Sequence, residues 1–525
     1  MRCCFCALLS SLLLTTIIFA ADQPGRPAAK PKPFTISEKT TRLLGPIHPE
    51  GYVDYVAVLN EEAGENVAPD QNAAIPICAL TARSGISSFG PVEWDWKEVA
   101  TRLNLEDHLL EHSKSRFYRL HELAGFPSSV DKKDRILREI IDAGSRPWTP
   151  ESSPWAARYI DANHPALPSI REALQRPHYF NPLMEDVVPT RNFRGALLVD
   201  LGSWLETLAF RQLDEGNLDE ASETTVLLFR LATHLRNSVT YHEARFGSIF
   251  HLDAARLSLV LIFAREASPE FIRKFRQQLK PFAKPVDVAK LFDRWARYRC
   301  LQFVQLRALR ALDDNRRLLL GIPLREDKMF GTMDGADWDL ALEQINLVFD
   351  AGVKAWENVP GPELLHSLLE MHSQHYSRTD VESTAATMSE LSQRRSSPFS
   401  DLPERKGRFF GELIAKDVIY SMHCEWDFGF TALQYLELVQ IAAVIRLQQL
   451  EHQTLPASSE ELRRSCPEIP ELSLWGEPFT YKTDGREFLL EVSRPAAIPV
   501  ADGKPFWPEN LEAVKIGLDI SEFFD

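Results

Sequence analysis

Hydrophobic residues recur every three or four positions along most of the chain, which is the period of an α-helix that packs on one face. The stretches that keep this period longest are 240–267, 285–320, 337–357, 361–379, 404–420 and 425–453. Each is long enough for several helical turns, so we predict a helix in each. The fold class that we expect is mostly α, a helical-hairpin or α-solenoid-like bundle.

The clearest predicted hairpin lies on either side of Gly216. The apolar stripe that precedes this glycine consists of Phe193, Leu197, Leu201, Trp204 and Leu208. Gly216 suits the left-handed position that ends a helix, and Asn217 can cap the next helix together with Glu220. Two helices joined by so short a turn are typical of helical repeat proteins, although no second copy recurs at a fixed period.

The end of the chain has a different pattern. PFTYKT and REFLLEV are short runs of residues that favour strands, and Asp484–Gly485 stands between them. An Asp-Gly pair between two such runs predicts a β-hairpin, because both central turn positions favour a positive φ. We therefore expect a small β-hairpin unit at the C-terminus.

Proline-rich stretches divide the chain into regions. The stretch DQPGRPAAKPKP near the N-terminus cannot bury apolar area and predicts a linker, while a second group of prolines discourages long helices. The division that follows is a signal peptide at 1–20, a linker at 21–50, an N-terminal helical region at 51–145, a proline-rich irregular connection at 146–191, a helical-hairpin core at 192–455 and a small C-terminal α+β unit at 456–525.

The first twenty residues predict export. Arg2 precedes an apolar run from Phe5 to Phe19, and small residues follow at Ala20 and Ala21. This is the layout of a secretory signal peptide, and the run is shorter than the roughly 20 apolar residues that span a membrane. We expect a periplasmic or extracellular protein, with retention of the segment as an anchor as the alternative.

The net charge and the hydropathy of the chain limit the kinds of partner that we expect. The net charge of −15 over 525 residues repels phosphate backbones, which argues against a nucleic-acid partner. Hydrophobic residues make up 44% of the chain, which is ordinary for a soluble globular protein. No later apolar run reaches spanning length, so we expect no transmembrane segment in the mature chain. The oligomeric state does not follow from these properties.

Four cysteines follow the leader: Cys78, Cys300, Cys424 and Cys466. Their wide spacing does not match a zinc site, in which pairs stand two to four residues apart. Export would permit disulfides, and four cysteines allow three pairings. Buried thiols are the simpler interpretation, because a chain of this size has enough core without crosslinks.

One group of histidines has the spacing of metal ligands. His372 and His375 are three residues apart, so on a helix both rings face the same way, with the carboxylate of Asp380 nearby. Pairs of ligands occur often by chance, and solvated histidines at a polar helix end explain the pattern as well. We therefore assign no metal and no cofactor, and keep His372 and His375 as the only candidate ligands.

A second group contains His234, His242, Glu243 and His251. His242 and Glu243 begin like the zinc-protease helix motif, but Phe246 stands where that motif needs its second histidine. We therefore expect a structural role, such as a histidine that is hydrogen-bonded inside a helical bundle. The sequence contains neither a nucleophile elbow nor a phosphate-binding loop, so the catalytic residues, if any, are unknown.

Three stretches carry a resemblance to a family. GYVDYVAVLNEEAGENVAPDQNAAIPICAL, LDEGNLDEASETTVLLFRLATHL and WGEPFTYKTDGREFLLEVS occur in this order along the mature chain. Together they resemble exported helical proteins of planctomycete bacteria. The resemblance implies a helical fold and export, and it implies no activity.

These observations favour a protein that acts by binding. Stacked helical hairpins offer wide surfaces that suit protein or peptide partners, so we expect an exported, non-enzymatic interaction or structural protein. The alternative is an extracytoplasmic hydrolase or metal-dependent enzyme whose residues converge only in the fold. A pocket with convergent histidines and carboxylates would favour that alternative.

Overall fold

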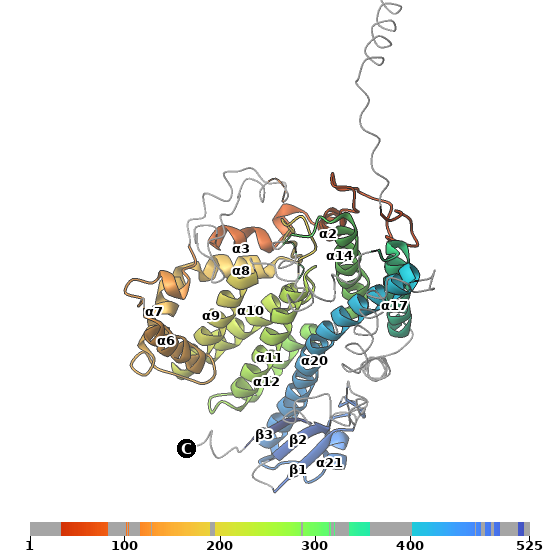
Figure 1. The fold of residues 1–525 in the computed structure, drawn as a ribbon. Coiled ribbons are helices and arrows are strands. Elements are labelled where there is room, and N and C mark those ends of the chain that lie inside the picture. The colour runs from red at the N-terminus through yellow and green to blue at the C-terminus, as the bar shows by residue number, and fades with distance from the viewer. Residues whose placement is uncertain are drawn as a thin grey trace, which may run out of the picture.

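The chain is mostly helical with a small antiparallel sheet, as predicted (Figure 1). The computed structural model describes residues 33–81, 116–127, 129–189, 195–284, 287–313, 335–357, 402–467, 469–473, 478–484, 488–493 and 513–518, and four single residues at 101, 103, 316 and 320. The predicted signal peptide lies outside these residues.

The N-terminal third forms short helices around the longer ones (Figure 1). They are α2 (Tyr55–Gly64), α3 (Ala74–Thr81), α6 (Val130–Ala143), α7 (Pro154–Asn163) and α8 (Leu167–Gln175). The last two are short helices within the proline-rich connection 146–191. Its prolines Pro154 and Pro168 stand in the first turns of α7 and α8, where a missing N–H costs no helical hydrogen bond.

Four consecutive helices form the centre of the first hydrophobic core. They are α9 (Gly195–Asp214), α10 (Leu218–Arg236), α11 (Tyr241–Phe263) and α12 (Pro269–Leu279). Gly216 has a φ of 75° between α9 and α10, as predicted. Asn217 stands at the cap position, but its side chain donates to Glu215 instead of capping α10, so that detail of the prediction is wrong.

The second core surrounds one long helix with a π-helical turn. This helix runs through α13 (Val288–Leu291), the π-turn η5 (Phe292–Ala296) and α14 (Arg297–Leu309), and we call it the π-turn helix. It packs with α2 and with α17 (Trp338–Glu357). The guanidinium of Arg297 is fully buried between Asp293 and Asp350, at 2.6 and 2.7 Å.

A single 51-residue helix, α20 (Leu402–His452), replaces the two helices predicted at 404–420 and 425–453. The residues between those ranges include no proline or glycine, so nothing in the backbone stops the helix there. The N-terminal half of α20 belongs to the second core, and its C-terminal half packs on α11 in the first core. The range 192–455 therefore contains two cores that α20 joins (Figure 1).

Part of the predicted linker 21–50 is folded. Phe34 is only 4% exposed and belongs to the second core. The backbone N–H of Thr35 donates to the Asp339 carboxylate at 2.6 Å, which attaches this segment to α17. The linker prediction is therefore wrong for residues 33–50, because apolar residues follow directly after the proline-rich stretch.

The C-terminal unit contains the predicted hairpin and one further strand. Helix α21 (Ser459–Ser465) precedes the sheet, in which β1 (Thr480–Thr483), β2 (Phe488–Ser493) and β3 (Ala513–Leu518) lie in this order. Both pairs are antiparallel, with Thr483 opposite Phe488 and Phe488 opposite Leu518. The sheet packs on α20, and the ring of Phe488 lies 5.8 Å from that of Phe263.

Helix α11 is the one described helix that is long and apolar enough to cross a membrane. Of its most apolar window, 72% is buried inside the protein, so its apolar surface serves the first core. The sequence analysis predicted this helix at 240–267 but no apolar run of spanning length, because His251 and Asp253 interrupt its apolar residues.

Candidate functional site

The candidate metal ligands His372 and His375 lie outside the described residues. Among the residues that the structure describes, no three histidine, cysteine or acidic side chains stand close enough together to hold a metal ion. Cys300 is buried in α14, while Cys78 and Cys466 are half-buried on α3 and after α21. The side chain of Cys424 is not among the described ones.

The second histidine group lies inside the helical bundle, as expected. His251 is fully buried, and its Nε2 lies 3.0 Å from the carbonyl oxygen of Phe282. Burial, with a smaller contribution from the charge of Arg236, lowers the pKa of His251 to about 3. Burial likewise lowers the pKa of His234 to about 4. Both rings are therefore neutral structural elements at pH 7.

Glu243 closes the N-terminus of α11 rather than acting as a catalytic base. Its fully buried carboxylate accepts hydrogen bonds from the hydroxyls of Ser238 and Thr240, both at 2.8 Å, and from Asn181 at 3.0 Å. The hydroxyl of Tyr179 donates at 3.2 Å. Several donors satisfy this carboxylate, so it joins the turn before α11 to the segment around residue 180.

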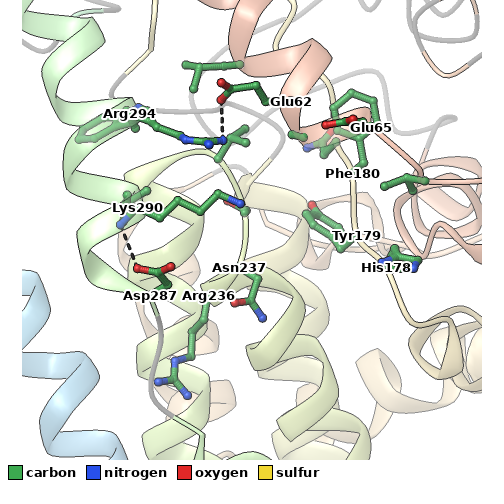
Figure 2. Close-up of a pocket in the computed structure, with 18 residues that line it drawn as sticks. Glu62, Glu65, His178, Tyr179, Phe180, Arg236, Asn237, Asp287, Lys290 and Arg294 are labelled. Carbon is green, nitrogen blue, oxygen red and sulfur yellow. Dashed lines mark hydrogen bonds and ion pairs between the residues drawn. The ribbon is translucent and has the colours of Figure 1, made fainter. Parts of the chain in front are cut away.

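A pocket of about 420 Å³ opens directly beside this network (Figure 2). Four parts of the chain meet around it: the end of α2, the segment 178–181, the α10–α11 turn and the start of the π-turn helix. Its volume falls within the range of small-molecule sites. We call it the α2 pocket, and it is the candidate functional site.

The π-turn η5 forms one wall of the α2 pocket. It contributes Arg294 and Trp295 to the lining, and Leu291 and Lys290 come from the turn before it. The indole of Trp295 is held in place, because its N–H donates to the Pro189 carbonyl at 3.0 Å and its ring stacks on Tyr241. Single π-helical turns are rare and occur often at functional sites, so this wall supports the choice of the pocket.

Acidic residues gather where α2 ends. Glu62 and Glu65 line the pocket there, and the last turn of α2 contains no basic residue. The C-terminus of a helix carries a partial negative charge, so acids at this end are unfavourable unless a cation faces them. Arg294 supplies one such cation, since its Nη1 lies 2.6 Å from the Glu62 carboxylate.

Basic residues gather at the opposite wall. Lys290 and Arg294 stand in the first two turns of the π-turn helix, where the helix N-terminus is already positive. Asp287 caps this helix and accepts the backbone N–H of Lys290 at 3.0 Å. The Lys290 ammonium itself has no partner among the described residues, and its side chain reaches across the pocket (Figure 2).

Apolar side chains complete the lining of the pocket, and we call them the apolar band. Phe180, Leu59, Leu291 and Val67 all line the pocket. The ring of Phe180 lies against Gly64, where an added Cβ would stand 2.9 Å from the ring. A glycine at the end of α2 therefore allows Phe180 to approach the helix closely.

This arrangement suits binding better than catalysis. Ser238 is the one described serine in the lining, and its hydroxyl is engaged with Glu243. His178 is exposed at the rim, on the far side of the pocket from Lys290 (Figure 2). Oppositely charged walls together with the apolar band provide selective contacts for a polar ligand.

The sequence analysis did not identify the α2 pocket. One signal was available, because the stretch VLNEEAGE places acids at the end of a predicted helix, against the helix dipole. The π-turn has no comparable signature, and the four lining segments are far apart in the sequence.

No protein-family model, curated protein or solved structure matches this chain. The fold and the pocket define the class of protein. It is a mostly helical protein with a charged pocket between α2 and the π-turn helix. The resemblance to exported planctomycete proteins stays a prediction.

Two half-buried carboxyl groups interact between α9 and α11: Glu206 and Asp253. Burial and the charge of Asp253 raise the pKa of Glu206 well above its ordinary value. Burial also raises the pKa of Asp253 to about 6, although Arg256 lies 3.6 Å away. Native protein therefore holds protons that the unfolded chain has released between about pH 4 and pH 6.

We expect Asp253→Asn to stabilise the protein at pH 7 by about 2 kcal/mol, because an amide needs no proton and carries no buried charge. Because the carboxyl pKa is raised in the folded protein, the free energy of unfolding falls as pH rises from 4 to 6. The variant should show a smaller fall over this range. Urea unfolding at several pH values measures both effects. The exposed Asp134→Asn on α6 is the control, and equal slopes for Asp253→Asn and wild type would contradict the assignment.

Proposed function

We propose that the protein is a non-enzymatic binding protein for peptides, and that the α2 pocket is the binding site. The observation that carries this proposal is the pairing of an apolar band with charged walls of both signs, since a peptide offers all three kinds of group. We propose further that the predicted leader exports the chain, so that the site acts outside the cytoplasm.

The proposal also assigns a role to the helical bundle. Hairpin α9–α10 and helix α11 support the floor of the pocket through the α10–α11 turn. We propose a solenoid-like arrangement of these hairpins that serves as a rigid scaffold. A rigid scaffold lowers the entropic cost of binding, because the charged walls are held apart before the ligand arrives.

Equilibrium dialysis against a mixture of peptides of two to six residues tests this function. We expect the full chain to retain part of the mixture, and Ala63→Trp, which fills the pocket, to lower retention at least tenfold. The matched control is Ala57→Trp, on the same helix but lining a neighbouring hollow. Circular dichroism confirms that both variants fold.

Mass spectrometry of the dialysed peptides separates the two functional hypotheses. Intact peptides in both chambers support a binding protein, whereas progressive cleavage that Ala63→Trp abolishes would support the hydrolase alternative. If wild type retains nothing, or if both tryptophan variants retain as much as wild type, the proposed peptide site is wrong.

A further inference from the structure

The α2 pocket lies between the opposed ends of two helices. The C-terminus of α2 and the N-terminus of the π-turn helix both reach it, so a negative pole faces a positive one. Each pole also carries side chains of its own sign, Glu65 at the first and Lys290 at the second. These charges raise the field across the pocket instead of cancelling it.

Part of this charge is already neutralised within the protein. Glu62 and Arg294 pair with each other at 2.6 Å, so they bridge the two helices and fix their separation. Asp287 is engaged as the helix cap, and the buried Arg236 extends away from Lys290 (Figure 2). The charged side chains of the two walls that have no polar partner among the described residues are therefore Glu65 and Lys290.

Neither the Glu65 carboxylate nor the Lys290 ammonium has a hydrogen bond or ion pair within the described part of the chain. Both side chains line the pocket and are exposed to solvent, so a ligand can reach them. A helix C-terminus with an unpaired acid favours a cation, and a helix N-terminus with an unpaired ammonium favours an anion. One ligand that carries both charges satisfies both walls at once.

We propose that the α2 pocket selects zwitterionic ligands, such as short peptides with free termini. Lys290 binds the ligand carboxylate, Glu65 binds its ammonium group, and the apolar band around Phe180 contacts a side chain. This inference rests on the proposed peptide-binding function and adds the ligand class to it. The floor of hydrogen-bonded side chains around Glu243 holds the segment that carries Phe180.

Calorimetry with one dipeptide in three forms tests the inference. The probes are Leu-Phe with free termini, N-acetyl-Leu-Phe without the ammonium, and Leu-Phe amide without the carboxylate. A charge-assisted hydrogen bond contributes about 1.5–3 kcal/mol, so blocking either terminus should weaken binding roughly ten- to a hundredfold.

Two variants assign each terminus to its wall. We expect Lys290→Gln to weaken binding of the free dipeptide and to abolish the penalty of the C-terminal amide, while the penalty of N-acetylation remains. Glu65→Gln should show the reverse. Lys132→Gln and Asp134→Asn remove exposed charges on α6 and should behave like wild type.

The outcomes separate this inference from the function on which it rests. Equal affinity for all three probes, or identical responses of Lys290→Gln and Glu65→Gln, overturns the zwitterion inference. If none of the probes binds while the dialysis experiment retains other peptides, the inference is wrong and peptide binding stands. If the dialysis experiment is also negative, both fail.

Discussion

Replacing Gly411 with leucine is expected to separate α17 from α20 and to destabilise the second core by about 3 kcal/mol. A Cβ at Gly411 would lie 2.2 Å from the carbonyl oxygen of Ala341, and one at Gly407 would lie 2.1 Å from that of Asp337. Both are backbone atoms, one in α17 and one in the residue just before it, so no side-chain rotation relieves the contact.

Hydrogen exchange measured by mass spectrometry localises the effect. We expect faster exchange in α17 and in residues 402–418, whereas α9 to α12 should keep their protection because they belong to the other core. The control is Gly429→Ala in the same helix, where the added Cβ would meet only the Ser248 hydroxyl at 3.3 Å. Uniform protection in Gly411→Leu would show that the close approach of the helices is not needed.

The sequence predicts a helix correctly where its apolar residues keep a strong helical period and the face that they form is buried. Helices α11 and α17 begin within one residue of the predicted ranges 240–267 and 337–357. Local chemistry was also sufficient at Gly216, because a turn depends on its own few residues, and the two strands of the predicted hairpin pair as expected.

Errors arose where tertiary contacts outweigh the local pattern. The two helices predicted within α20 are one, since a weak apolar period does not stop a helix that its neighbours support. Residues 33–50 resemble a linker in sequence because their few apolar residues are scattered among polar ones, and Phe34 becomes buried only in the second core. Strand β3 follows a proline-rich stretch, and its pairing with β2 decides its conformation.

The α2 pocket illustrates a different limit. Glu65 and Lys290 are more than two hundred residues apart, so their opposition across a cavity is a property of the fold. The sequence shows that each charge stands at the unfavourable end of its own helix. Only the fold shows that the two helix ends face each other across the pocket. Residues that break a local rule are therefore a better guide to such a site than a motif search.

Acidification is expected to unfold the protein chiefly through two buried histidines. Their folded pKa values, about 4 for His234 and about 3 for His251, lie below the ordinary value of 6.5, so the unfolded chain binds more protons below pH 6.5. The free energy of unfolding should fall as pH drops from 6.5 towards 3. Two such shifts cost together about 5 kcal/mol or more, which is comparable with the whole stability of many proteins.

His251→Gln tests this explanation, because a glutamine amide can still donate to the Phe282 carbonyl but does not titrate. We expect the variant to retain its fold to a lower pH than wild type, with the acid midpoint shifted down by about half a pH unit or more. The control His452→Gln removes an exposed histidine at the end of α20 and should leave the midpoint unchanged. Circular dichroism at 222 nm across pH 7 to 3 follows the loss of helix, and superimposable curves for His251→Gln and wild type would rule out the buried imidazole.

Asp253 and His251 make opposite contributions over the same pH range, although both lie on α11. Protonation of the carboxyl raises the free energy of unfolding as pH falls through 6 to 4. The imidazole lowers the free energy of unfolding as pH falls below 6.5. The double variant Asp253→Asn/His251→Gln should therefore show a flatter pH dependence than either single variant. The double variant lacks both groups with shifted pKa values, whereas each single variant keeps the other group and therefore its contribution to the slope.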